Sequence, residues 1–165
     1  MSDTGAGVLG DVRRRLIRTY PEQVRACLEV LSDAEIWSRS NASSNSIGNL
    51  VVHLCGSTRH FIGMAIGGTA YKRNRPAEFA EKGPIPREVL LRALDQAVWE
   101  ADRVLEGLTP EGLLVRSERL PEGFTALELI LRTSHHWATH TGQILYAVKA
   151  LKGPAFEEHW RKTRG

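Results

Sequence analysis

The sequence is poor in cysteine and has no long apolar run. Its two cysteines, Cys27 and Cys55, are too few for a disulfide scaffold and lack the paired spacing of a thiolate zinc site, so we expect both to be small buried hydrophobes. No stretch is apolar for long enough to span a bilayer, and the first residues lack the basic and apolar regions of a secretion signal. These absences favour a cytoplasmic protein without a membrane partner.

Excess charge is also scarce. The formal net charge is +3, and much of the excess lies near the two ends, in residues 13–18 and 161–164. No nucleic-acid-binding motif accompanies these residues, so we expect solvated helix ends, with weak attraction of anionic small molecules as the alternative. With 165 residues, 42% hydrophobic and 25% charged, the chain fits one globular domain over residues 1–165.

Apolar residues recur at helical spacing in four segments, and no segment shows the alternation of a strand. The predicted helices cover about residues 10–31, 46–67, 86–107 and 125–152. Pro21 should kink the first helix, and Pro86 should begin the third. Thr125 and Glu128 have the pattern of a capping box at the start of the fourth. The segments between are predicted to be a loop at 32–45, long connections at 68–84 and 108–123, a short extended piece at 113–115 and a charged tail at 153–165. The pattern indicates an all-α four-helix bundle with a core of about residues 8–152.

Two histidines of the fourth predicted helix, His136 and His140, lie four residues apart and should face the interior. The predicted inward positions of this helix are Leu129, Thr133, His136, His140, Gln143, Ile144, Ala147 and Leu151. His135 lies about 100° around the helix and should face the rim or solvent. Two buried imidazoles on neighbouring turns need partners for their ring N–H groups, and nearby side chains offer few. The pair is therefore either two hydrogen-bonded core histidines or part of a metal site, which would need a third ligand.

His53, in the second predicted helix, is the candidate for that third ligand. It lies between Leu50 and Leu54, at the interior edge of the apolar stripe. Facing helices of a bundle commonly supply the ligands of one metal ion. Three neutral imidazoles would leave an exchangeable position on zinc or another borderline divalent ion. The two ligand helices carry no inward Asp or Glu, which argues against a di-iron carboxylate centre.

Five polar residues are candidates for substrate binding: Arg59, His60, Arg73, Arg75 and Gln143. Arg59 could grip a carboxylate, whereas His60 either lines a pocket wall or is solvated. Arg73 and Arg75 either meet an anionic group of a substrate or are surface charges. Gln143 either orients a group at the site or is a helix-packing amide.

Three stretches of the chain together resemble the DinB-like (YfiT-like) superfamily of metal-binding helical bundles. They are Ser46-Ile47-Gly48-Asn49-Leu50-Val51-Val52-His53-Leu54, Arg73-Asn74-Arg75-Pro76-Ala77-Glu78-Phe79, and His136-x-x-x-His140-Thr141-Gly142-Gln143-Ile144. The resemblance implies that His53, His136 and His140 hold one divalent metal ion per chain, nickel or zinc. It also implies a homodimer, since members of the superfamily look like homodimers. The characterised members include thiol-dependent transferases and isomerases that use bacillithiol, mycothiol or related thiols, which implies a small-molecule substrate and a low-molecular-weight thiol as co-substrate.

The predicted function is that of a metal-dependent enzyme. We expect a thiol-dependent S-transferase, or a related transferase or hydrolase, in which the ion activates a thiol or water. No side chain is singled out as catalytic beyond the metal ligands. Two alternatives stay open: a non-catalytic metal-binding or stress-response protein, and a metal-free helical interaction module whose histidines belong to the core.

Overall fold

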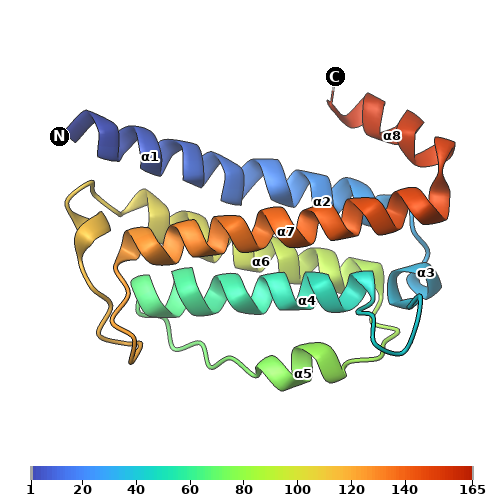
Figure 1. Cartoon of the computed structure of the whole chain (residues 1–165), viewed down its shortest axis with the longest axis horizontal. Helices are drawn as coiled ribbons and strands as arrows, with labels where there is room; N and C mark the ends of the chain where they lie inside the picture. Colours follow the sequence, from blue (N-terminus) through green and yellow to red (C-terminus); the bar gives the residue numbers. More distant parts are fainter. Residues whose placement is uncertain (1, 165) are drawn as a thin grey trace.

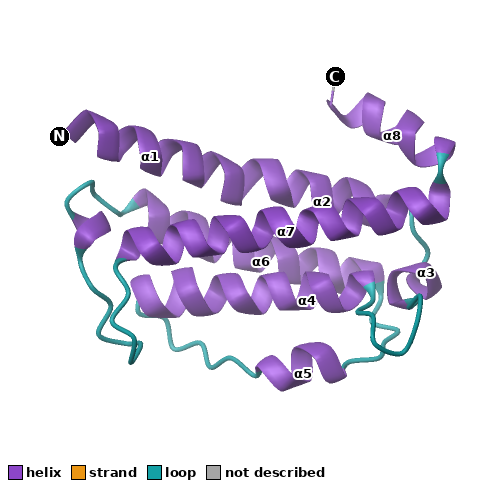
Figure 2. Cartoon of the chain, viewed as in Figure 1, coloured by secondary structure: helices purple, strands orange, loops and turns teal. Residues whose placement is uncertain are grey.

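Four helical rods run side by side in the computed structural model, which describes residues 2–164 and the side chains of residues 4–161 (Figure 1). The rods are α1 (Ser2–Arg14) with the π-helical segment η1 (Arg15–Thr19) and α2 (Tyr20–Glu29); α4 (Ile47–Thr58) with the π-helical segment η2 (Arg59–Ile66); α6 (Arg87–Glu106); and α7 (Ala126–Lys152). The second rod packs against both α6 and α7, and α2 packs against α7. Between residues 2 and 164 there is no strand, only an isolated bridge between Arg116 and Thr125 (Figure 2). The predicted all-α four-helix bundle is confirmed.

Capping residues mark where the helices of the site begin. The Ser46 side chain accepts a hydrogen bond from the Asn49 backbone N–H at the start of α4, and the Asn49 side-chain oxygen accepts one from the Ser46 backbone N–H. Thr125 and Glu128 form the predicted capping box at the start of α7, and Gly153 ends that helix. Each box satisfies backbone N–H groups that have no partner within the helix.

The first rod differs from its prediction at two points. It begins at Ser2, well before residue 10, and it passes Pro21 without a break. Immediately before this proline the turn is π-helical, and the Tyr20 N–H reaches the Arg15 carbonyl five residues back. The wider turn leaves room for a ring that would otherwise clash with the preceding turn.

Short helices occupy segments that were predicted to be irregular. The loop at 32–45 contains α3 (Asp33–Trp37), and the connection at 68–84 contains α5 (Arg75–Ala80). The predicted extended piece at 113–115 is wrong, because η3 (Gly112–Leu114) is a 3₁₀ turn. The charged tail forms α8 (Pro154–Arg164), which buries Phe156 and packs against α2 and α7. The basic side chains of 162–164, predicted to be solvated, lie outside the described side chains.

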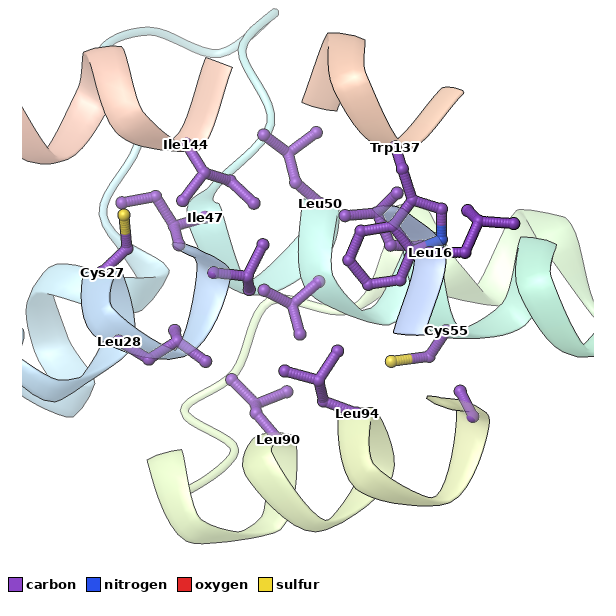
Figure 3. Close-up of a cluster of buried hydrophobic side chains, with 14 of the residues drawn as sticks. Leu16, Cys27, Leu28, Ile47, Leu50, Cys55, Leu90, Leu94, Trp137 and Ile144 are labelled. Atoms are coloured by element: carbon purple, nitrogen blue, oxygen red, sulfur yellow. The ribbon is translucent and has the colours of Figure 1, made fainter. Parts of the chain in front are cut away.

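The core lies where the four rods meet (Figure 3). Cys27 and Cys55 are buried there as free thiols, as predicted. The inward stripe of α7 was predicted correctly only in part. Leu129, Thr133 and Ile144 are buried as predicted. Trp137 and Thr141 are buried in place of the histidines that precede them, and Gln143 and Leu151 are exposed. His136 and His140 therefore lie at the edge of the packed stripe and are only half-buried. No helix among the described residues has both the length and the apolar character needed to cross a membrane.

Candidate metal centre

Three imidazoles from two helices converge beside the core. His53 comes from α4, and His136 and His140 come from α7; each offers one ring nitrogen, and these atoms lie within 4.8 Å of one another. The Nε2 atoms of His53 and His136 are 2.8 Å apart. His53 is buried and the other two are half-buried, so the α4 side of the cluster is shielded from solvent and the α7 side is more accessible to it.

Glu78 fixes the ring of His53. Its Oε2 atom lies 2.7 Å from His53 Nδ1, and a carboxylate at this distance accepts a hydrogen bond from the Nδ1–H group. Arg73 grips both oxygens of Glu78 through Nε at 2.7 Å and Nη2 at 2.8 Å. Arg73 Nη2 also lies 3.1 Å from His53 Nδ1. Two donors cannot hydrogen-bond to each other, so the Glu78 carboxylate accepts a hydrogen bond from each of them. The lone pair of His53 Nε2 consequently faces the other two histidines.

The carboxylate reaches His53 because α5 docks on α4 (Figure 1). The Asn49 side-chain amide donates to the backbone oxygens of Glu78, at 3.0 Å, and Glu81, at 2.8 Å. Gly56, three residues after His53, leaves the space for the Glu78 side chain, since a β-carbon there would overlap its Oε1 atom. A glycine within a helix costs about 1 kcal/mol relative to alanine, and at this position it admits the carboxylate.

Gln143 holds His140 in a similar way from within α7. Its Oε1 atom lies 2.7 Å from His140 Nδ1. An amide oxygen only accepts, so His140 carries its proton on Nδ1 and keeps the lone pair of Nε2 free. Of the two interpretations of Gln143, orientation of a group at the site fits this contact, although Gln143 itself is exposed.

The surroundings of the third ring, His136, indicate whether the cluster fits a metal ion. Its buried Nδ1 atom has no hydrogen-bond partner among the described residues, and its Nε2 faces His53 Nε2. Since His53 Nδ1 carries a proton, the two Nε2 atoms share one further proton, which a cation could replace. Nitrogen ligands about 2.0–2.1 Å from a tetrahedral ion lie roughly 3.3 Å apart, so the His53 and His136 nitrogens would separate by about half an ångström to admit zinc. The His140 nitrogen lies within 4.8 Å of both. The donor set, three neutral imidazoles, suits a borderline divalent ion.

The electrostatics keep the rings of His53 and His136 neutral. Burial, followed by the charges of His140, His53, Arg73 and Arg132, lowers the pKa of His136 to about 3. Burial also lowers the pKa of His53, against the opposing effect of Glu78. Metal ligation requires unprotonated imidazole nitrogens, and His53 and His136 supply them at neutral pH.

The neutral state of His136 predicts weaker folding in acid. Its pKa of about 3 lies below the ordinary value of 6.5, so the unfolded chain binds more protons than the folded chain between these values. The free energy of unfolding of the metal-free chain should therefore fall as the pH falls from about 6.5 toward 3. Urea unfolding with a chelator present, at about pH 7.5 and about pH 5, measures this loss.

Substituting the histidine isolates its share of that pH dependence. Wild type should lose more stability between the two pH values than His136→Gln does. His135→Gln is the matched control, because His135 is exposed on the same helix, and it should lose as much as wild type. Equal losses in wild type and His136→Gln would contradict the assignment.

The other predicted site residues lie at different distances from the cluster. Arg59 is engaged elsewhere: it pairs with Glu100 at 2.8 and 3.0 Å and stacks on the Tyr71 ring. His60 is half-buried, with its ring edge-on to Phe61. Neither bonds to the three histidines.

The two arginines of the long connection have different partners. Arg73 is the largely buried partner of Glu78 described above, so the interpretation as a surface charge is wrong. Arg75 is exposed and lies over the Phe79 ring, which in turn packs against His53 with centroids 4.6 Å apart. Sequence reasoning missed the roles of Glu78, Phe79 and Gly56, although the first two lie in the stretch that carries the family resemblance.

Comparison with known proteins identifies the fold as that of the DinB-like proteins. A crystal structure described as a DinB-like protein from Bacillus cereus ATCC 10987 superposes with a TM-score of 0.62 at 12% sequence identity, over 80% of this chain and 85% of that one. This likeness confirms the predicted DinB-like architecture. The chain belongs to the family described as "Protein of unknown function (DUF1572)", whose model matches residues 3–161. No curated protein matches the chain significantly.

Proposed function

We propose that this chain is a metal-dependent enzyme, a thiol-dependent S-transferase or a related transferase or hydrolase. His53, His136 and His140 would hold one divalent ion, zinc or nickel. The observation that carries the proposal is the orientation of the rings: His53 and His140 each direct Nδ1 at an acceptor, which leaves Nε2 free to ligate. Core histidines without a ligand role would need no such arrangement on two separate helices.

The chain's own residues orient the ligands and shield one side of the site. Glu78 and Gln143 set the proton positions of His53 and His140, and Phe79 covers the His53 ring. The half-exposed α7 side is where a small molecule would approach. An ion held by three neutral ligands keeps its full positive charge, which lowers the pKa of a thiol or water and so favours a nucleophile at neutral pH.

Turnover distinguishes an enzyme from a metal-binding protein. Zinc-loaded and nickel-loaded chain would be assayed with bacillithiol, mycothiol and simpler thiols against alkyl halides, aryl halides and epoxides, by loss of free thiol. We expect turnover that chelation abolishes and that His140→Ala lowers by at least about 100-fold, since the ion supplies the activation. His135→Ala, an exposed neighbour on α7, should keep wild-type turnover. Full metal loading without turnover would instead indicate a non-catalytic metal-binding or stress-response protein.

Several finer features stay predictions. They are the identity of the ion, the low-molecular-weight thiol, the homodimer, the cytoplasmic location and substrate binding by Arg59, His60, Arg73, Arg75 and Gln143.

A further inference from the structure

Arg132, on α7, is held by aromatic rings and makes no ion pair with an acidic side chain of the described residues. Its Cζ atom lies 5.1 Å from the centroid of Phe61 and 5.6 Å from that of Phe124. Arg59 and Arg73, by contrast, each grip a carboxylate with two nitrogens. Rings that face a guanidinium restrain its plane while its N–H groups, which point outward in that plane, stay available for hydrogen bonding. Arg132 is exposed, so a ligand can reach these donors.

The position of Arg132 relates it to the metal centre. It lies four residues before His136, on the same face of α7, and side chains at this spacing are neighbours about 5–6 Å apart at Cβ. Phe61 belongs to η2 and Phe124 to the segment before α7, so the rings hold the guanidinium between the second rod and the start of α7. Arg132 and His136 therefore project from adjacent turns of α7, the helix on the more open side of the histidine cluster.

The charges around the cluster favour an anionic ligand. Glu78 is the carboxylate that contacts His53, and its charge is matched by the bidentate contact with Arg73. An imidazole that ligates a metal through a nitrogen lone pair carries no charge, so a divalent ion there would leave the site with a net positive charge to which Arg132 adds. Arginine binds carboxylates with two parallel hydrogen bonds, which gives direction as well as attraction.

We propose that Arg132 binds a carboxylate of the thiol co-substrate, so that the site selects thiols with a carboxylate a few bonds from the sulfur. The inference rests on the proposed function, because the sulfur end of such a molecule would be held at the metal. Arg132 acts as a specificity-determining residue. Because His136 and Arg132 are one helical turn apart on α7, we expect the site to prefer a short spacer between sulfur and carboxylate.

A pair of matched thiols tests the assignment. The chain would be loaded with Co²⁺, whose visible spectrum reports on its ligands, and titrated with 3-mercaptopropionate and with the neutral methyl 3-mercaptopropionate at constant ionic strength. We expect wild type to bind the carboxylate thiol about tenfold more tightly or better than the ester. Arg132→Gln should bind Co²⁺ as wild type does but lose this preference. Arg92→Gln is the matched control, since Arg92 is an exposed arginine of α6 and its loss changes the net charge equally.

The outcomes separate this inference from the proposed function. Two results would overturn the role of Arg132 while leaving the metal site intact. In both, every variant binds Co²⁺. Either wild type shows no preference for the carboxylate thiol over the ester, or Arg132→Gln shows the same preference as wild type. Failure of wild type to bind Co²⁺ would overturn the proposed function, and this inference with it. A preference lost in Arg132→Gln and kept in Arg92→Gln would support the assignment.

Discussion

Replacing Trp137 with alanine should lower the free energy of unfolding by about 3–5 kcal/mol, the range for removing a fully buried large aromatic side chain. Trp137 is 0% exposed in the core of the bundle. Its ring stacks on Tyr20, and its Nε1–H donates to the Thr58 hydroxyl at 2.8 Å, so it joins α7 to α4 and to the first rod. The substitution would remove these contacts and leave a cavity. Urea unfolding followed by far-ultraviolet circular dichroism measures the loss.

Two controls show whether burial causes the effect. Trp137→Phe keeps an aromatic ring and loses mainly the N–H donor and part of the volume, so its cost should be smaller, about 1–2 kcal/mol. Trp99→Ala removes the same side chain from an exposed position on α6, where it is 64% exposed, and should change stability by less than about 1 kcal/mol. Similar losses for Trp137→Ala and Trp99→Ala would contradict the packing described here.

The second large effect is expected for Glu78→Ala, which should weaken both folding and metal binding. The Arg73 side chain is only 11% exposed, and removal of Glu78 leaves its charge without a carboxylate, at a cost of about 3–5 kcal/mol. His53 also loses the acceptor that fixes its proton on Nδ1. Loss of such an outer partner typically lowers metal affinity about 10–100-fold. Chemical unfolding and competition with a chromophoric chelator measure the two effects.

A double substitution separates stability from metal affinity. Replacing both members of a buried ion pair with apolar residues is often close to neutral, so Arg73→Met with Glu78→Met should recover much of the stability. Metal affinity should stay low in the double variant, because His53 still lacks its acceptor. If Glu78→Ala bound metal as tightly as wild type, Glu78 would have no part in positioning His53.

The features predictable from the sequence are those set by local chemistry. Thr125 with Glu128 marks a helix start because their side chains satisfy backbone N–H groups nearby in sequence. The four-residue spacing of His136 and His140 places both rings on one face of any helix that contains them. These local signals located the bundle and the three histidines.

The features that could not be predicted depend on contacts between distant segments. Glu78 reaches His53 only because Asn49 docks α5 on α4, a contact across 29 residues that no local pattern reveals. The error in the α7 stripe has a similar cause, since Trp137 and Thr141 are buried through packing with other rods. The segment at 153–165 was predicted to be a charged tail, yet proline suits the first turn of a helix, and α8 begins at Pro154.

The central claim is that His53, His136 and His140 bind one divalent ion, and metal content tests it most directly. Wild type, His140→Ala and His135→Ala would each be incubated with zinc or nickel, dialysed and subjected to elemental analysis, with circular dichroism to verify helicity. We expect about one ion per chain in wild type and in His135→Ala, and little in a His140→Ala variant that stays helical. Full occupancy in His140→Ala, or no retained metal in wild type, would contradict the claim.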